Sequence, residues 1–348
     1  MLNRLLRSHL HPYRKLLVAV VALQTVQTVA ALFLPRLNAE IIDDGVLRGD
    51  TGFIWRTGSI MLVVTVVQVA FNIAAVWAGS KASMGMGRDI RDDLFHRVTD
   101  FSAREVAHFG APSLITRITN DVQQVQMLVQ MTCTLLVAAP IMALGGVVMA
   151  MREDVGLSWL LLVSIPLLLV SVGSVILRMM PQFRRMQELI DGMNRILREQ
   201  ITGIRVVRAF VREPEETARF AGSNADVTDT ALKAGRLMAF MFPIVNVVVN
   251  VSSVGVLWFG ASRINSGELQ VGSMVAFLTY LTQILMAVMM ATWMMALVPR
   301  AAICAERIQE VLDTQSAVVT ASNPTTVMPE RGTLEFRNAG FRLSLIHI

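Results

Sequence analysis

The segment QITGIRVVRAFVREPEETARF, residues 200–220, decides how the rest of the chain is interpreted. It is amphipathic and lies well away from every long apolar run. We interpret it as the end of one long helix, a short connecting turn or helix, and the start of another. The apolar runs on either side of it then form a membrane bundle from which this segment projects.

The composition is that of a membrane protein. Of 348 residues, 54% are hydrophobic and 16% are charged, and the mean hydropathy is +0.55. Soluble domains carry about 45–50% apolar and about 25% charged residues. The net charge of +5 fits basic cytoplasmic loops. Because aromatic residues are few and do not interleave with basic ones, we expect no nucleic-acid partner.

Six apolar stretches are long enough to cross a bilayer, which takes about 20 residues. They are residues 16–34, 58–79, 128–151, 155–177, 237–261 and 271–298. The basic N-terminus resembles a signal peptide, but the stretch after it is long enough to span, so we expect an uncleaved first helix. Basic residues concentrate in the N-terminal tail and in the connections 81–127 and 178–236. This distribution places both termini and both long connections in the cytoplasm.

The two long connections are predicted to be helical hairpins. In the second, apolar residues recur at steps of three and four from Phe183 to Ile204, which defines one helical face. At 1.5 Å per residue this helix would project roughly 40 Å from the membrane. The first connection has the same pattern and breaks at Gly110, Ala111 and Pro112, because glycine and proline disfavour helix. The alternative is a pair of amphipathic helices lying on the membrane surface.

The six stretches contain no Asp, Glu, Lys, Arg or His. Ionisable residues inside membrane helices usually mark ion-coupled transport, so their absence argues against a secondary transporter. Uncharged polar and methionine side chains remain as candidates to line a substrate path, with helix packing as the alternative for each. These candidates are Gln24, Gln27, Asn246, Asn250, Gln283, Met286, Met290, Trp293 and Met294.

The chain changes character after the last stretch. Residues 301–313 resemble a helix, residues 314–330 form a polar linker, and residues 331–342 begin a β-strand. Cys133 and Cys304 offer neither a disulfide framework nor the spacing of a zinc site, so we expect no metal centre. A membrane domain is therefore expected over residues 1–313.

Several separated motifs resemble those of ATP-binding cassette (ABC) exporters, the family of bacterial multidrug and lipid exporters. The family pattern E-x-x-x-G-I-x-x-V-(K/R)-x-F-x-x-E is matched by Glu199, Gly203, Ile204, Val207, Arg208, Phe210 and Glu213. HFGAPSLITRITNDVQQV, residues 108–125, resembles F-x-x-x-x-x-G-x-L-x-x-R-x-x-x-D, with Ser113 where glycine is usual. LPRLNAEIIDDGV and AERIQEVLD also fit, so the resemblance covers about residues 1–342.

Together with the six stretches, the resemblance implies an all-α membrane protein with six transmembrane helices and two long cytoplasmic helical hairpins. Residues 331–342 would be the first strand of a nucleotide-binding domain. The hairpin turns would be short coupling helices, near residues 107–113 and 211–218, that dock on such domains. Their predicted contact residues are His108, Phe109, Gly110, Ala111, Pro112 and Ser113, and Arg212, Glu213, Pro214, Glu215 and Glu216. A solvated helix corner is the alternative for the second turn.

The implied protein is a half-transporter in the bacterial cytoplasmic membrane. It would pair with an identical or different second half-transporter and move hydrophobic or amphipathic small molecules, drugs or lipids outward by alternating access. ATP and Mg²⁺ would bind in the full-length protein. The chain has no G-x-x-x-x-G-K-(S/T) phosphate loop, and Leu343 stands where the family places the aromatic residue that stacks on adenine. These residues alone therefore cannot hydrolyse ATP.

Residues 343–348, LSLIHI, resemble a translated sequencing adapter, so we expect a non-native tail and a longer natural protein. Two other functions stay open. One is a permease that recruits a separate ATPase, and the linker and strand weigh against it. The other is an ion-coupled transporter or a non-catalytic membrane scaffold, and the uncharged stretches weigh against that.

Overall fold

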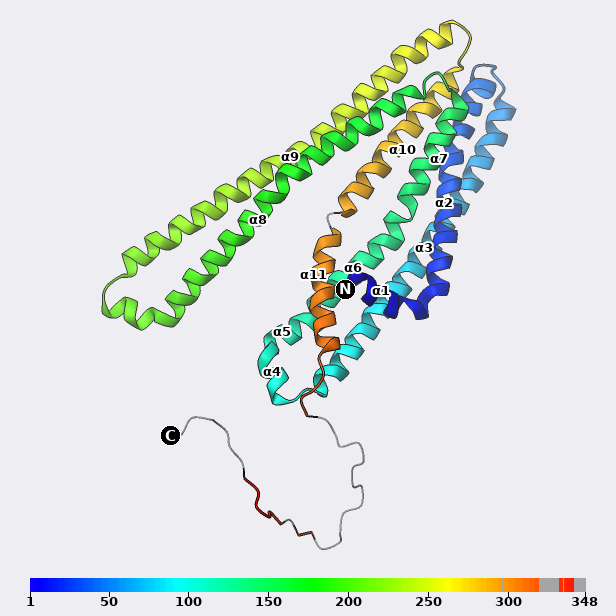
Figure 1. Cartoon of the computed structure of the whole chain (residues 1–348). Helices are drawn as coiled ribbons and strands as arrows, with labels where there is room; N and C mark the ends of the chain where they lie inside the picture. Colours follow the sequence, from blue (N-terminus) through cyan, green and yellow to red (C-terminus); the bar gives the residue numbers. More distant parts are fainter. Residues whose placement is uncertain (296, 319–331, 334, 341–348) are drawn as a thin grey trace.

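The computed structural model describes residues 1–295, 297–318, 332–333 and 335–340. Long helices run through most of this described chain, in two groups that separate toward one end (Figure 1). The short connections between long helices gather at the opposite end, whereas the N-terminus and both hairpin turns lie toward the end where the groups separate (Figure 1).

Six helical segments are long and apolar enough to cross a membrane. They are Leu2–Val46, Thr51–Thr99, Ala111–Glu153, Trp159–Ala209, Glu213–Asn265 and Val271–Asp313. Five of them contain one of the apolar stretches predicted from the sequence, and Trp159–Ala209 contains all but the first four residues of the stretch 155–177, which confirms six candidate spans. The chain is therefore a multi-pass membrane protein.

The spans are assembled from the following elements. The first contains α1 (Leu2–Leu10), η1 (His11–Tyr13), α2 (Arg14–Glu40) and η2 (Ile41–Val46), and the second is α3 (Thr51–Thr99). After α4 (Ala103–Phe109), the third contains α5 (Ala111–Thr116), η3 (Arg117–Asp121), α6 (Val122–Met131), η4 (Thr132–Leu136) and α7 (Ala138–Glu153). The others are α8 (Trp159–Ala209), α9 (Glu213–Asn265), and α10 (Val271–Met295) with α11 (Leu297–Asp313).

Helices α8 and α9 lie side by side along their length and diverge from the other helices (Figure 1). We call this pair of helices the arm. The two helices have 51 and 53 residues. At 1.5 Å per residue each is about 75–80 Å long, more than twice the roughly 30 Å hydrocarbon core of a bilayer. A helical hairpin therefore projects far beyond the membrane, as the apolar periodicity predicted.

Two apolar cores hold the helices together. One joins α2, α7, α8, α9 and α10, and within it the buried Tyr280 donates its hydroxyl to the Leu32 carbonyl at 2.8 Å. The other joins α1, α3, α6 and α11 nearer the hairpin turns, through buried residues such as Leu5, Ile90 and Ile308. The second core fixes the base of the first hairpin against α11, the helix that leads out of the last span.

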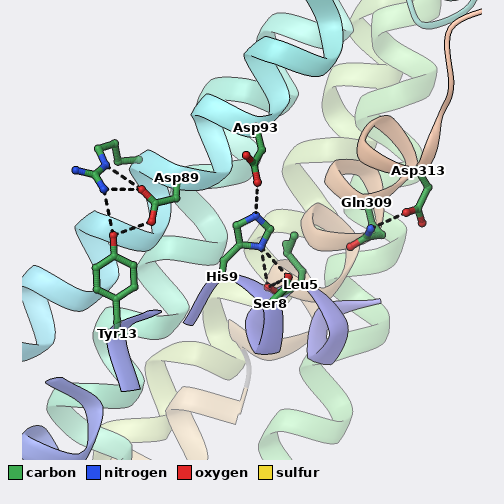
Figure 2. Close-up of polar contacts among 9 residues, drawn as sticks. Leu5, Ser8, His9, Tyr13, Asp89, Asp93, Gln309 and Asp313 are labelled. Carbon is green, nitrogen blue, oxygen red and sulfur yellow. Dashed lines mark hydrogen bonds and ion pairs between the residues drawn. The ribbon is translucent and has the colours of Figure 1, made fainter. Parts of the chain in front are cut away.

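Polar contacts also fasten α1 to α3 (Figure 2). His9 Nε2 lies 3.0 Å from Asp93 Oδ2, and the Tyr13 hydroxyl donates to Asp89 at 2.7 Å. Leu5, one turn before His9 on α1, is fully buried. The segment before the first span is thus packed on the stem of the first hairpin.

The β-strand predicted over residues 331–342 is not present in the residues described there, 332–333 and 335–340. A strand is defined by hydrogen bonds to a neighbouring strand, and none of the described segments offers one. The all-helical membrane domain is confirmed, whereas the strand is not. Most of the predicted linker, from residue 319 to 330, and the predicted tail over 343–348 lie outside the described residues.

Candidate functional site

The first hairpin turn consists of two short helices that meet at Gly110. Helix α4 begins with a capping box, in which Ser102 Oγ accepts the Arg104 N–H at 3.2 Å and Glu105 accepts the Ser102 N–H at 2.9 Å. Gly110 has a φ of 76°, a positive value that glycine adopts without strain. The helix break predicted at this glycine is confirmed.

Phe109 anchors this turn to the protein. Its ring stacks on Phe101 with centroids 5.8 Å apart, and the Arg117 guanidinium lies 4.9 Å from its centroid. Gly110 and Ser113 are partly buried beside it. The exposed members of the predicted contact set are His108, Ala111 and Pro112. The first hairpin turn therefore exposes a small, mostly uncharged surface, which is supported by the stacked rings of Phe101 and Phe109.

The capping box makes the first turn sensitive to acid. The Ser102 hydroxyl, 2.6 Å from the carboxylate, and then the Ser102 N–H hold the pKa of Glu105 below its usual range. A carboxyl group whose pKa is lowered by folding stabilises the folded state at any pH above its pKa in the unfolded chain. This stabilisation is lost as the pH falls through the pKa that the group has in the folded protein.

We expect hydrogen exchange of the α4 amides, corrected for intrinsic rates, to accelerate as the pH falls below about 4. Glu105→Gln should make this exchange independent of pH over the same range, because no charge remains to titrate. Glu188→Gln on α8 is the matched control. If the acid-side acceleration persisted in Glu105→Gln, Glu105 would not be its source.

The second hairpin turn is a tight reversal and not a separate helix. Helix α8 ends at Ala209, Val211 has a φ of 55°, and α9 begins at Glu213 with Pro214 in its first turn. Proline fits there because the first amides of a helix need no intrahelical partner. The prediction of a short coupling helix over residues 211–218 is therefore wrong in form, because residues 213–218 continue directly into α9.

The tip of the second turn is apolar and surrounded by charge. Phe210 and Val211 are 72% and 75% exposed. Arg212 pairs with Glu215 at 2.8 Å, and Glu216 accepts a hydrogen bond from Gln200 on α8 at 3.1 Å through its carbonyl. Exposed aromatic and aliphatic groups inside a polar rim are typical of protein docking surfaces.

Gln24 fills a packing role in the bundle. Its side chain is buried, and its amide donates to the carbonyls of Cys133 and Thr134 at 3.4 and 3.3 Å. These two residues belong to the π-helical η4, where the regular hydrogen-bond pattern of an α-helix is interrupted. Gln24 thus satisfies main-chain groups between α2 and η4.

Gln27, Asn246 and Asn250 make local contacts. Gln27 accepts a hydrogen bond from its neighbour Thr28 at 3.1 Å. Asn250 donates to the Asn246 carbonyl at 2.8 Å, and both asparagines are exposed on one face of α9. They remain available for contacts beyond this chain.

The predicted methionine stripe of α10 runs from the surface into the core. Met286 is exposed, Met290 is partly buried, and Met294 is buried against α6 and α11. The side chain of Trp293 lies outside the described structure. Of the three methionines, Met286 and Met290 are thus the ones accessible from outside the protein.

Gln283 lies at an open depression of about 420 Å³ between α2, α3 and α10. Its Oε1 is buried and has no hydrogen-bond partner among the described residues. The depression is lined by Ala31, Leu34, Pro35, Asn38, Met61, Gln68, Thr279 and Gln283. An unpartnered buried acceptor costs free energy, so a hydrogen bond made to this oxygen would stabilise the protein.

Three polar residues of this depression were missed in the sequence. Asn38 and Gln68 come from two other helices and meet Gln283 only in the fold, whereas Thr279 lies one turn before Gln283 on α10. Gln68 carried a signal, because it is the one amide within the apolar run VVTVVQVAF. Asn38 lies near the end of α2, where polar residues are ordinary.

These features define a class of protein: a polytopic membrane domain whose long helices extend into hairpins beyond the apolar spans. The family described as "ABC transporter transmembrane region" matches residues 17–288. The chain therefore belongs to the ABC transporter family, and its resemblance to the membrane half of ABC exporters is confirmed.

Three relatives illustrate the match. The chain is 53% identical over 324 residues to an uncharacterised ABC transporter ATP-binding protein of Mycobacterium tuberculosis (strain CDC 1551 / Oshkosh), covering 93% of this chain and 56% of the relative. It is 32% identical over 337 residues to the uncharacterised ABC transporter ATP-binding protein YfiB of Bacillus subtilis (strain 168), covering 96% and 58%. It is 26% identical over 343 residues to YgaD of the same organism, a putative multidrug export ATP-binding/permease protein, covering 95% and 58%. The chain thus spans little more than half the length of these relatives.

Proposed function

We propose that this chain is the membrane-spanning subunit of an ATP-driven exporter in a bacterial cytoplasmic membrane, with both termini in the cytoplasm. The observation that carries the proposal is the pair of hairpin turns toward the same end of the molecule (Figure 1). Each turn presents exposed side chains on a long helical stem. This arrangement suits transmission of force from a domain outside the membrane to the spans.

The stems are suited to act as levers. Helix α3 runs unbroken for 49 residues and α8 for 51, so each is continuous from its hairpin turn through its apolar stretch. Closure of nucleotide-binding domains would draw the turns together, and the rigid stems would pass that movement to the spans. Coupling of this kind requires ATP and substrate each to bind the two states of the bundle differently.

ATP chemistry is not assigned to any residue of this chain. The sequence lacks the glycine-rich loop with its lysine that cradles phosphates in P-loop proteins. ATP and Mg²⁺ would be held by a nucleotide-binding domain, and all three relatives above have ATP-binding in their names. The residues described here would bind substrate and receive movement.

We also propose that a second half-transporter, identical or different, packs on the arm of α8 and α9. These helices make their main contacts with each other and, nearer the end with the short connections, with α10. Large apolar residues such as Ile201, Val206 and Phe240 are exposed along the arm. A second subunit would cover this surface and complete a path between the two bundles.

The proposed cargo is a hydrophobic or amphipathic small molecule, drug or lipid. The depression at Gln283 combines apolar walls with amides and a hydroxyl, and none of its lining residues is charged. Such a site favours a ligand that offers a hydrogen-bond donor on a mainly apolar body. YgaD, named for multidrug export, is consistent with this class of cargo.

Gln283→Met should separate the binding role of this residue from a structural one. We expect it to raise the free energy of unfolding by about 1 kcal/mol, because an unpartnered buried oxygen is removed. Transport of a donor-bearing substrate should fall about tenfold, through lost hydrogen bonding. Gln24→Met is the control, and it should lower stability because two carbonyls lose their donor. Lower stability in both variants, with unchanged transport by Gln283→Met, would contradict the binding role.

The function itself is tested with the full-length gene product in inverted membrane vesicles. We expect uptake of a lipophilic fluorescent dye that requires ATP and stops with vanadate, together with ATP hydrolysis stimulated by the dye. Uptake driven by an ion gradient without ATP would support the ion-coupled alternative. Uptake only with a separately expressed ATPase would support the permease alternative.

A further inference from the structure

A buried ionic cluster joins the first hairpin to α11. Arg117 of η3 is 9% exposed, and its Nη1 donates to the Arg307 carbonyl and to Glu310 Oε2, each at 2.7 Å. Both acceptors belong to α11, some 190 residues further along the chain. One guanidinium therefore ties the hairpin to both the main chain and a side chain of that helix.

A second ion pair runs in the opposite sense between the same two elements. Asp121 is 1% exposed, and Arg307 Nη1 lies 3.3 Å from its Oδ2. The cations and carboxylates thus alternate between η3 and α11. Because the pairs are crossed, α11 cannot slide or rotate along η3 by one residue without separating both.

The cluster reaches the turn itself through Phe109. The Arg117 guanidinium lies 4.9 Å from the Phe109 ring centroid, within the range of a cation–π contact. Phe109 is the last residue of α4, immediately before Gly110. Arg117 therefore contacts the turn on one side and α11 on the other, and α11 leads into residues 314–330.

The chemistry of the cluster indicates that it fixes the position of α11 along η3 more than it stabilises the fold. Arg117 Nε and Asp121 Oδ2 are buried and have no hydrogen-bond partner among the described residues. Arg307 Nη1 lies close to Asp121 Oδ2, but its hydrogen bond goes to Asp121 Oδ1 at 3.4 Å. Arginine does not lose its proton in proteins, so the buried charge must keep its partners. Incompletely satisfied buried ion pairs contribute little net stability, but they strongly disfavour arrangements in which one partner is removed.

The second turn has no such tie to α11 among the described residues. Its ion pairs, Arg212 with Glu215 and Arg219 with Glu199 and Glu216, stay within the arm of α8 and α9. The two hairpin turns are therefore attached differently. The first is locked to the helix that leaves the last span, whereas the second moves with its own arm.

We propose that Arg117 is a positioning residue that makes the first turn and α11 one rigid unit, so that both carry a single movement into the bundle. This inference rests on the proposed ATP-driven function. It predicts that the distance between the first turn and α11 stays constant through the transport cycle, while the distance between the first and second turns changes.

The test uses spin labels at exposed positions of the full-length protein in lipid nanodiscs, with Cys133 and Cys304 replaced by serine. Labels at Arg104→Cys on α4 and Glu306→Cys on α11, both exposed, should give one narrow distance distribution, unchanged by ATP with vanadate. Arg117→Met should broaden it and lower substrate stimulation of ATP hydrolysis about tenfold, with basal hydrolysis retained. Arg117→Lys should restore part of the stimulation, because it keeps the charge but lacks the planar guanidinium that faces the Phe109 ring.

Two further variants keep the outcome decisive. Glu310→Gln, at a half-exposed side chain, should fold even if Arg117→Met does not, and should broaden the distribution to a smaller extent. Arg219→Gln, in the exposed pairs of the second turn, should leave it unchanged. A narrow distribution and full stimulation in both Arg117→Met and Glu310→Gln would overturn the proposal. Absence of ATP-dependent transport in the unsubstituted protein would instead overturn the proposed function. The label distances would still show whether the first turn and α11 form one rigid unit.

Discussion

Asp154→Ala should lower the free energy of unfolding by about 3 kcal/mol, because it removes one member of a buried, hydrogen-bonded ion pair. Asp154 directly follows the last residue of α7, and its side chain is 4% exposed. One carboxylate oxygen accepts the Leu157 N–H at 2.7 Å, and the other accepts Arg263 Nε at 3.1 Å. The residue thus holds the α7–α8 turn against the far end of α9.

Asp229→Ala is the matched control for this prediction. Asp229 pairs with Lys233 at 2.6 Å on α9, but both side chains are more than half exposed. Exposed pairs of this kind contribute about 0–1 kcal/mol. Reversible unfolding in mixed micelles, followed by far-UV circular dichroism, measures both variants. A similar loss in the two would mean that burial at Asp154 is not what makes its pair important.

Gly272→Ala should lower the free energy of unfolding by about 2–3 kcal/mol through overpacking. A Cβ at residue 272 would overlap the Ala39 carbonyl oxygen and lie 2.8 Å from Asp43 Cγ. The Gly272 N–H also donates to Asp43 Oδ1 at 2.7 Å, which fixes the start of α10 against the end of the first span. The added methyl group would force these two elements apart.

Gly235→Ala should have the opposite sign. Gly235 is exposed within α9, and a Cβ there meets no atom within 4 Å. Alanine in an exposed helix interior is favoured over glycine by about 1 kcal/mol, so this variant should be more stable than the unsubstituted protein. The same unfolding measurement serves for both. If Gly272→Ala were also stabilising, the contact between α10 and the end of α2 would be looser than the structure shows.

The two hairpin turns show how much of the structure can be predicted from neighbouring residues alone. Gly110 and Pro112 predicted the corner of the first hairpin, because their backbone preferences act wherever the chain lies. The second corner was predicted in place but not in form. Pro214 and the glutamates after it favour the start of a helix, and that helix is α9 itself and not a separate coupling helix.

The polar residues inside the bundle were beyond local reasoning. Gln24 and Gln283 read alike in the sequence as amides in apolar runs. In the fold, Gln24 donates to two carbonyls of η4, whereas Gln283 Oε1 lacks a partner at the depression. The difference depends on which distant helix lies opposite each amide.

The sequence by itself determined six membrane spans and two helical hairpins, because hydropathy and apolar periodicity are properties of neighbouring residues. Only the tertiary structure decided which buried polar groups are paired. Arg117 and Glu310 belong to motifs that are visible in the sequence, yet their contact spans 193 positions. Such pairings follow from how whole helices pack, and the energy of a buried charge depends on that packing more than on its neighbours in the chain.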